Sequence, residues 1–435
     1  MGDGALEEVI PEQAFAALVQ RQGDMLFRLA EALRTRGDAD WTRRHFFQLV
    51  SEADAVEAFL DDFGARHNRT FAYLRELVAS VRGFALAGFS IAHLAVRLDG
   101  YPSVLSTGEA ASSGDSVRRT QAFLVRTVRR LLAAVEEESR TLGIRLPTDP
   151  FPEDRWMADE PRRKLARNMG QGELASDEQK TAEIASKFVE AAILFEDLGV
   201  RRIAGEHERE TWLQHNCSEE RARSLEATVH NLQSAYDTWV KGTAIEAGDP
   251  RLPKLRGHAS AALHLLEAVT QLTHFVERHE RTMRDDAIAR RIAGLVSKSE
   301  VRDTTLNHML VHAGVYLRRG RSVAEDLLPS YTNVQEIEVG LRDDVVLHAR
   351  PAALIVGIVQ RYGTPVEFEV DGHRCNAASI LEMMVTVGSA PEARRFLFRG
   401  DERPLRDIAL LFEHALGEDG LDRLPPPLAY LRSER

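Results

Sequence analysis

One histidine lies at the predicted start of a helix, with an arginine two residues further on. The segment reads Val346-Leu347-His348-Ala349-Arg350-Pro351-Ala352-Ala353. A histidine at a helix N-terminus faces unpaired backbone N–H groups and the positive end of the helix dipole. This field disfavours the imidazolium ion, so we expect a neutral, nucleophilic ring. Arg350 adds a fixed positive charge with a fork of N–H donors, and helix N-termini bind phosphate well. The segment therefore predicts phosphate chemistry at His348.

The residues around this segment predict a small α+β domain. Apolar and polar residues alternate over 337–341 and 366–370, which indicates half-buried strands. Asp371-Gly372 predicts a two-residue hairpin turn, and a further strand is expected at 396–398. Helical spacing over 352–362 separates the first two strands, and helical spacing over 405–416 follows the last strand, with Asp401 as its predicted N-cap. The predicted order is strand, helix, strand, strand, short helix, strand, helix, with the helices on one face of a mainly antiparallel sheet.

The His348 segment resembles the active-centre motif of HPr, the phosphocarrier of the bacterial phosphoenolpyruvate-dependent phosphotransferase system. Two further segments match this family in the same order: Asn376-Ala377-Ala378-Ser379-Ile380-Leu381 and Gly400-Asp401-Glu402. The resemblance covers roughly 335–420, under a quarter of the chain. It implies an HPr-like open-faced sandwich, with His348 as the phosphoryl acceptor and Arg350 as its electrostatic partner. It also implies an enzyme I-like protein as the phosphoryl donor.

Ser379 lies where some HPr proteins carry a regulatory serine that a dedicated kinase phosphorylates. In such proteins a basic residue often precedes the serine, whereas this chain has Ala378. We therefore favour a structural role, in which Ser379 is the N-cap of a short helix over 380–385. Val346 is another departure, because the family usually has glycine at this position.

Ile380, Leu381 and Met384 are predicted to form an apolar patch near His348. The matching surface of HPr docks partner proteins, so the resemblance implies a partner-binding role for these three residues. The alternative that one or two of them belong to the core stays open.

The much longer region before Arg319 is predicted to be an all-α helical bundle. Apolar residues recur at three- and four-residue spacing, and each such stripe must be buried against another helix. The predicted helices run over 12–36, 40–64, 68–98, 115–142, 178–199, 217–241, 257–296 and 301–319. The chain is therefore expected to be multidomain, with helical parts at 1–145 and 181–320, a proline-containing linker or long loop at 146–180, a short linker at 321–333, the HPr-like domain at 334–420 and a C-terminal tail at 421–435.

Composition excludes several classes of protein. A net charge of −11 over 435 residues argues against a general nucleic-acid binder. The acidic N-terminus lacks the apolar core of a signal peptide, and the longest apolar stretch, 84–94, is too short to span a bilayer. Cys217 and Cys375 form no CxxC pair, which favours a reducing compartment. We expect a cytoplasmic protein that contacts no membrane and needs no cofactor.

Two histidine pairs in the helical region were weighed as metal ligands. His308 and His312 are four residues apart, and His274 and His279 are five apart. No HExxH or paired ExxH motif accompanies them, so we expect ordinary, partly buried histidines and no metal site. Both cysteines are expected to be inert or lightly exposed thiols.

Three functions remain open from the sequence. The first is a regulatory or signalling phosphoacceptor, not itself an enzyme, in which phosphate on His348 alters interactions of the helical region or of other protein partners. The second is an interaction scaffold in which the HPr-like fold docks partners without phosphotransfer. Independent catalysis by the helical region is a third, weaker option. A homodimer is possible, but no heptad seam supports it.

Overall fold

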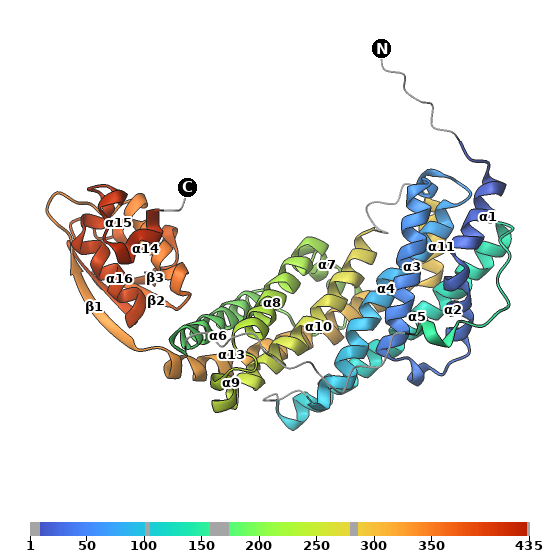
Figure 1. The fold of residues 1–435 in the computed structure, drawn as a ribbon, viewed down its shortest axis with the longest axis horizontal. Helices are drawn as coiled ribbons and strands as arrows, with labels where there is room; N and C mark the ends of the chain where they lie inside the picture. Colours follow the sequence, from blue (N-terminus) through green and yellow to red (C-terminus); the bar gives the residue numbers. More distant parts are fainter. Residues whose placement is uncertain (1–8, 101–104, 157–173, 279–285, 433–435) are drawn as a thin grey trace, which may run out of the picture. The chain divides into compact units, whose positions relative to one another are not determined.

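A computed structural model describes residues 9–100, 105–156, 174–278 and 286–432 (Figure 1). The chain divides into two compact units. The first comprises Met1–Asn168, Phe195–His230 and Gly257–Leu317, and the second comprises Met169–Leu194, Asn231–Arg256 and Arg318–Arg435. Four long helices contribute to both units: Leu174–Glu196 (α6), Glu219–Trp239 (α8), Arg251–Glu277 (α10) and Val311–Tyr331 (α13).

The first unit is helical, as predicted. Its other helices are Glu12–Gln22 (α1), Asp24–Arg34 (α2), Arg43–Asp62 (α3), Ala72–Arg97 (α4), Thr107–Thr141 (α5), Glu206–Asn216 (α7), Asp286–Leu295 (α11) and Lys298–Asp303 (α12). Helix α4 packs between α3 and α5 (Figure 1). Gly88 on α4 permits this approach, because a Cβ atom there would come within 2.2 Å of the Phe46 ring on α3. Leu77, Phe84 and Ile91 of α4 are fully buried, so the apolar stripes meet one another as expected.

Helix α4 is also long and apolar enough, by length and composition, to cross a membrane. However, 67% of its most apolar window is buried inside the fold. A core helix has the same composition for a different reason, which is that it is surrounded by other helices. The burial of α4 supports a core role.

Two helix boundaries differ from the sequence prediction. The helix predicted over 12–36 is interrupted at Gly23, which separates α1 from α2. Helix α5 begins at Thr107, inside the Gly- and Ser-containing gap between the helices predicted over 68–98 and 115–142. The reason is a capping box, in which Ser106 Oγ accepts the Glu109 N–H and Glu109 Oε2 accepts the Ser106 N–H.

Two other predicted segments fall partly outside the described residues. The helix predicted over 257–296 corresponds to α10 and α11, and residues 279–285 between them lie outside the described part of the chain. In the proline-containing segment at 146–180, residues 157–173 lie outside it as well. Residues 146–156 contain no α-helix, and α6 begins at Leu174.

The junction before the C-terminal domain is helical where a short linker was predicted. A π-helical turn, Thr304–Leu310, leads into α13, which continues to Tyr331 with Pro329 in its last turn. The Asn333 N–H donates to Asp401 Oδ1 at 3.0 Å, and the Asn333 carbonyl accepts the Glu402 N–H at 2.8 Å. Arg403 donates to the Tyr331 carbonyl at 2.8 Å. The chain is therefore held at this point by hydrogen bonds.

Asp401 is the N-cap residue of the last helix, Glu402–Glu413 (α16), but its side chain does not cap that helix. Its carboxylate accepts instead from the Asn333 N–H and, at 2.6 Å, from Arg403 Nε. This corrects the predicted capping role. A carboxylate with two nearby donors at the domain junction satisfies those donors rather than the helix terminus.

The C-terminal domain has the predicted α+β architecture. Its strands are Val334–Gly340 (β1), Val366–Val370 (β2), His373–Asn376 (β3) and Arg395–Asp401 (β4), and its other helices are Ala349–Tyr362 (α14) and Ile380–Gly388 (α15). The strand order is β1-β4-β2-β3 and every pair is antiparallel. Asp371 and Gly372, with φ of 48° and 80°, form the predicted two-residue turn between Val370 and His373.

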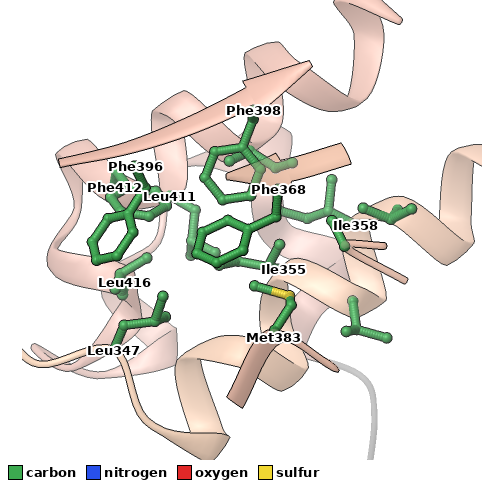
Figure 2. Close-up of a cluster of buried hydrophobic side chains, with 14 of the residues drawn as sticks. Leu347, Ile355, Ile358, Phe368, Met383, Phe396, Phe398, Leu411, Phe412 and Leu416 are labelled. Carbon is green, nitrogen blue, oxygen red and sulfur yellow. The ribbon is translucent and has the colours of Figure 1, made fainter. Parts of the chain in front are cut away.

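One face of this sheet carries the domain core. Figure 2 shows the rings of Phe368, Phe396 and Phe398 among aliphatic side chains of the three helices. The Phe368 ring centroid lies 5.0 Å from that of Phe398. Side chains that alternate with these residues, such as Glu369, are more exposed and pair across strands, as in the 2.7 Å contact of Glu369 with Arg374. The result is an open-faced sandwich with an apolar covered face and a charged open face.

The segment predicted as a C-terminal tail is instead part of this core. Leu424, Leu428 and Leu431 are buried in the same cluster as the three phenylalanines. Leu424 directly follows the 3₁₀ turn Leu421–Arg423, and Leu428 and Leu431 lie in the 3₁₀ segment Pro426–Arg432. The sequence did not predict that this segment is packed, because 3₁₀ segments of three and seven residues are too short to show a repeating pattern of apolar residues.

Candidate functional site

His348 is the N-cap residue of helix α14. The loop that carries it is anchored on both sides of Val346, because Val345 and Leu347 are buried in the core while Val346 faces outward. The His348 side chain is 49% exposed. The site is therefore fixed in position and open to a reactant.

One hydrogen bond and one charge contact of His348 assign the roles of its two ring nitrogens. Nδ1 lies 3.4 Å from the Arg350 backbone N, which can only donate, so Nδ1 holds its lone pair toward the helix start. In the neutral ring the proton is then on Nε2, which lies 3.3 Å from Glu418 Oε1. An unprotonated nitrogen at a helix N-terminus, held only by a long hydrogen bond of 3.4 Å, is suited to attack an electrophilic phosphorus atom once that bond is released.

Arg350 and Pro351 of the motif occupy the first turn of α14, as predicted. The Arg350 side chain is exposed, so its guanidinium is accessible to phosphate oxygens. Pro351 is buried, and its missing N–H costs nothing at this position of a helix. The structure thus brings His348 and Arg350 together at one helix terminus.

Glu418 was missed by the sequence analysis. It belongs to the chain after α16, far from His348 in sequence, and no local motif marks it. Only the fold of the C-terminal segment places its carboxylate against the His348 ring.

Ser379 caps helix α15, as expected. Its hydroxyl accepts the Glu382 N–H at 3.2 Å, and Glu382 Oε2 accepts the Asn376 N–H at 3.2 Å. The helix extends to Gly388, beyond the predicted end at Val385. The hydroxyl thus has a structural role in the protein as it stands.

The predicted apolar patch is exposed, with one change of membership. Ile380 is 41% and Leu381 76% exposed, whereas Met384 is only partly exposed. Val385, which the sequence analysis left out, is 66% exposed. Its position four residues after Leu381, on the same helix face, could have identified it. We refer to Ile380, Leu381, Met384 and Val385 as the α15 patch.

Comparison with known families supports the resemblance. Residues 335–389 match the family model described as the PTS HPr component phosphorylation site. These residues form an HPr-type domain. No family model matches the helical region. Searches of curated proteins and of solved structures gave no match for the chain.

The other residues weighed in the sequence do not assemble into a second site. His308 and His312 contact Ser116 and Ser112 of α5, at 3.0 and 3.2 Å, and burial lowers the pKa of both imidazoles. His274 Nδ1 lies 2.8 Å from a Glu219 carboxylate oxygen, and its proposed partner His279 lies outside the described residues. Within the described ranges, no group of three side chains is placed to hold a metal ion.

Neither cysteine has the environment of a reactive thiol. Cys217 is buried, and burial raises the pKa of its thiol to about 12. Burial also raises the pKa of the partly exposed Cys375. Both thiols are therefore protonated near neutral pH, and the thiolate is the reactive form.

Proposed function

We propose that this protein is a regulatory phosphoacceptor. In this proposal an enzyme I-like donor phosphorylates His348 of the HPr-type domain, and the helical region acts as the effector or interaction platform. The chain itself would accept a phosphoryl group rather than catalyse an independent reaction. The observation that carries the proposal is the Nδ1 lone pair of a half-exposed histidine at the start of α14.

The proposed step is a transfer between two phosphorus–nitrogen bonds. The Arg350 N–H releases Nδ1. The Nδ1 lone pair of His348 then attacks the phosphorus of a phosphohistidine on the donor, a new P–N bond forms, and the donor's P–N bond breaks. The departing nitrogen keeps the electron pair of the broken bond. Nε2 of His348 keeps its proton beside Glu418. N–H groups at the start of α14 and the Arg350 guanidinium would receive the phosphoryl oxygens.

The α15 patch suggests how a partner protein would be recognised. Leu381 and Val385 are the most exposed members of the α15 patch, and apolar side chains in such a patch are typical of protein contacts. We propose that this patch docks the donor. We also propose a cytoplasmic location, in which both free thiols would stay reduced.

The test is incubation with labelled phosphoenolpyruvate and enzyme I, followed by peptide mapping of the acid-labile label. We expect label on His348 and none after His348→Gln. His373→Gln is the matched control, since His373 is also an exposed histidine of this domain but lies in a hairpin. If His348 stays unlabelled while a free HPr in the same tube is labelled, the proposal is wrong.

The exposure of the α15 patch also supports a docking scaffold that works without phosphate. This alternative and the main proposal differ in their response to two substitutions. In a scaffold, His348→Gln leaves the cellular function intact and Leu381→Asp abolishes partner binding. In a phosphoacceptor, His348→Gln abolishes the function although the α15 patch is intact and the variant still binds its partner.

A further inference from the structure

The chain beyond α16 forms a strap that braces the HPr-type domain. We use the name C-terminal strap for residues 415–432. Its buried leucines belong to the core of the domain, and Figure 2 shows Leu416 in the same cluster as Leu347, the residue that precedes His348. We use the name phosphorylation loop for residues 341–348, which connect β1 to α14. The strap thus packs against the core residues that support this loop.

Two tyrosines and one aspartate fasten the far end of the strap. Tyr430 donates its hydroxyl to Asp407 Oδ2 at 2.6 Å, and Tyr362 of α14 donates to the same oxygen at 2.9 Å. Asp407 is buried on α16. The Arg361 guanidinium lies 4.0 Å from the centroid of the Tyr430 ring. This latch joins the strap to α14 and α16, two of the three helices that cover the sheet.

The near end of the strap has an unusual backbone. Ala415, Leu416 and Gly417 follow one another with φ of 52°, 55° and 76°. Residues other than glycine disfavour this left-handed region, and such conformations persist only where surrounding contacts hold them. Ala415 and Leu416 are both almost fully buried, which supplies those contacts. The consequence is a tight reversal that presents the next two residues, Glu418 and Asp419.

Both of these acidic residues contact the phosphorylation loop. Glu418 Oε1 lies 3.3 Å from His348 Nε2, and Asp419 Oδ2 lies 3.2 Å from Arg342 Nη1. These two contacts tie the strap to the loop at two points. Within the loop, Arg342 also pairs with Asp344 at 2.9 Å. The strap therefore contacts the loop on the side of the ring opposite the helix terminus.

We infer that Glu418 is a positioning residue, held by the C-terminal strap, that keeps the proton of His348 on Nε2 and directs phosphorylation to Nδ1. The negative charge of a carboxylate oxygen 3.3 Å from Nε2 favours the tautomer that carries its proton on Nε2. When Nδ1 bonds to phosphorus, the ring becomes cationic and the same carboxylate offsets that charge. The inference rests on the proposed function for its importance in the cell, but its chemistry can be tested separately.

The test uses phosphoramidate, a small phosphoryl donor that needs no enzyme and releases ammonia on transfer. Phosphorus NMR of the product distinguishes Nδ1- from Nε2-phosphohistidine. We expect wild-type protein to be labelled on Nδ1. Glu418→Ala should raise the ratio of Nε2 to Nδ1 product about threefold, the size of effect expected when one partly exposed charge contact is lost. Glu418→Gln removes the charge but keeps an oxygen acceptor of the same reach, so its ratio should lie between those of wild type and Glu418→Ala.

Two further variants complete the experiment. Glu413→Gln removes an exposed carboxylate at the end of α16 and should leave the ratio unchanged. Tyr430→Phe removes only the latch hydroxyl and should move the ratio in the direction of Glu418→Ala. Circular dichroism checks that each variant is folded. A wild-type ratio in Glu418→Ala would overturn the inference.

The outcomes separate the inference from the proposed function. If enzyme I fails to label the wild-type protein but phosphoramidate shows the predicted dependence on Glu418, the proposed function fails and the positioning role stands. If enzyme I labels His348 and the Glu418→Ala ratio is unchanged, the proposed function stands and the positioning role of Glu418 is wrong.

Discussion

The helical region and the HPr-type domain each use a histidine at a helix N-terminus. In the helical region, His45 is the third residue of α3, and its Nδ1 accepts the Thr42 N–H at 2.9 Å. In the HPr-type domain, His348 precedes α14, and its Nδ1 accepts the Arg350 N–H at 3.4 Å. The same ring nitrogen thus accepts a backbone hydrogen bond at both sites.

The two rings differ in what surrounds them. His45 is 1% exposed, its ring packs edge-on against Trp156, and its Nε2 is buried without a hydrogen-bond partner among the described residues. Burial, with the nearby Arg36 and Arg44, lowers the pKa of His45 to about 4. The His348 side chain is half-exposed and its Nε2 faces a carboxylate. Exposure therefore makes the difference between a structural cap and a residue available for chemistry.

The largest expected effect contrasts one buried arginine with one exposed arginine. Arg75 of α4 is 3% exposed and pairs with Glu57 at 2.8 Å, with Glu76 at 3.2 Å and with Asp61. Arg75→Met removes the cation that these carboxylates share. Because Arg82 still pairs with Glu57 and Arg278 with Glu76, the cost should be about 3 kcal/mol of unfolding free energy, the low end for breaking a buried ion pair. The matched change Arg374→Met, at a side chain 58% exposed, should cost less than about 1 kcal/mol. Urea unfolding followed by circular dichroism measures both, and equal costs would contradict the contrast between the regions.

Acid should destabilise the helical region through His45. The pKa of His45 is about 4 in the folded protein against 6.5 for the ordinary group, so the unfolded chain binds the proton more tightly. The contribution of His45 to the unfolding free energy is present above pH 6.5. It falls by roughly 3 kcal/mol as the pH drops toward 4.

His45→Gln isolates this contribution from that of other buried histidines. Glutamine can accept the Thr42 N–H in the same capping box but does not titrate. The difference in unfolding free energy between wild type and His45→Gln should therefore change between pH 6.5 and 4. A constant difference across this range would show that His45 is not the group responsible.

The cap of α15 should contribute a smaller amount. Ser379→Ala removes the hydroxyl that accepts the Glu382 N–H and should lower the thermal stability of the HPr-type domain by about 1 kcal/mol. Ser379→Asp supplies another good N-cap and should retain most of that stability. A larger loss for aspartate than for alanine would contradict the capping role.

The smallest expected effect on stability is at His348 itself. His348→Gln removes a half-exposed ring and a long hydrogen bond, so its unfolding free energy should change by less than about 0.5 kcal/mol. A variant that is stable but unlabelled separates the chemical role of His348 from the structural role of His45. Marked destabilisation by His348→Gln would remove that distinction.

Local sequence was sufficient wherever the relevant interactions span a few residues. The His-Ala-Arg-Pro segment, the Asp371-Gly372 turn and the Ser379 cap each depend on neighbours within one turn of chain. The capping box of Ser106 and Glu109 is equally local and was overlooked because the surrounding glycines and serines indicated a loop. Asp401 shows the limit of such reasoning, since its carboxylate binds groups from the junction instead of its own helix.

The sequence by itself determined the HPr-type domain, its phosphorylation motif and the helical nature of the remaining chain. These follow from periodicity and from short motifs whose physics is local. Only the tertiary structure decided that His45 is buried and His348 exposed, that α13 runs to the domain junction, and that the C-terminal segment belongs to the core. It also decided that Glu418 faces the His348 ring. The physical reason is that burial and long-range pairing depend on how distant segments pack, which no local pattern of residues specifies.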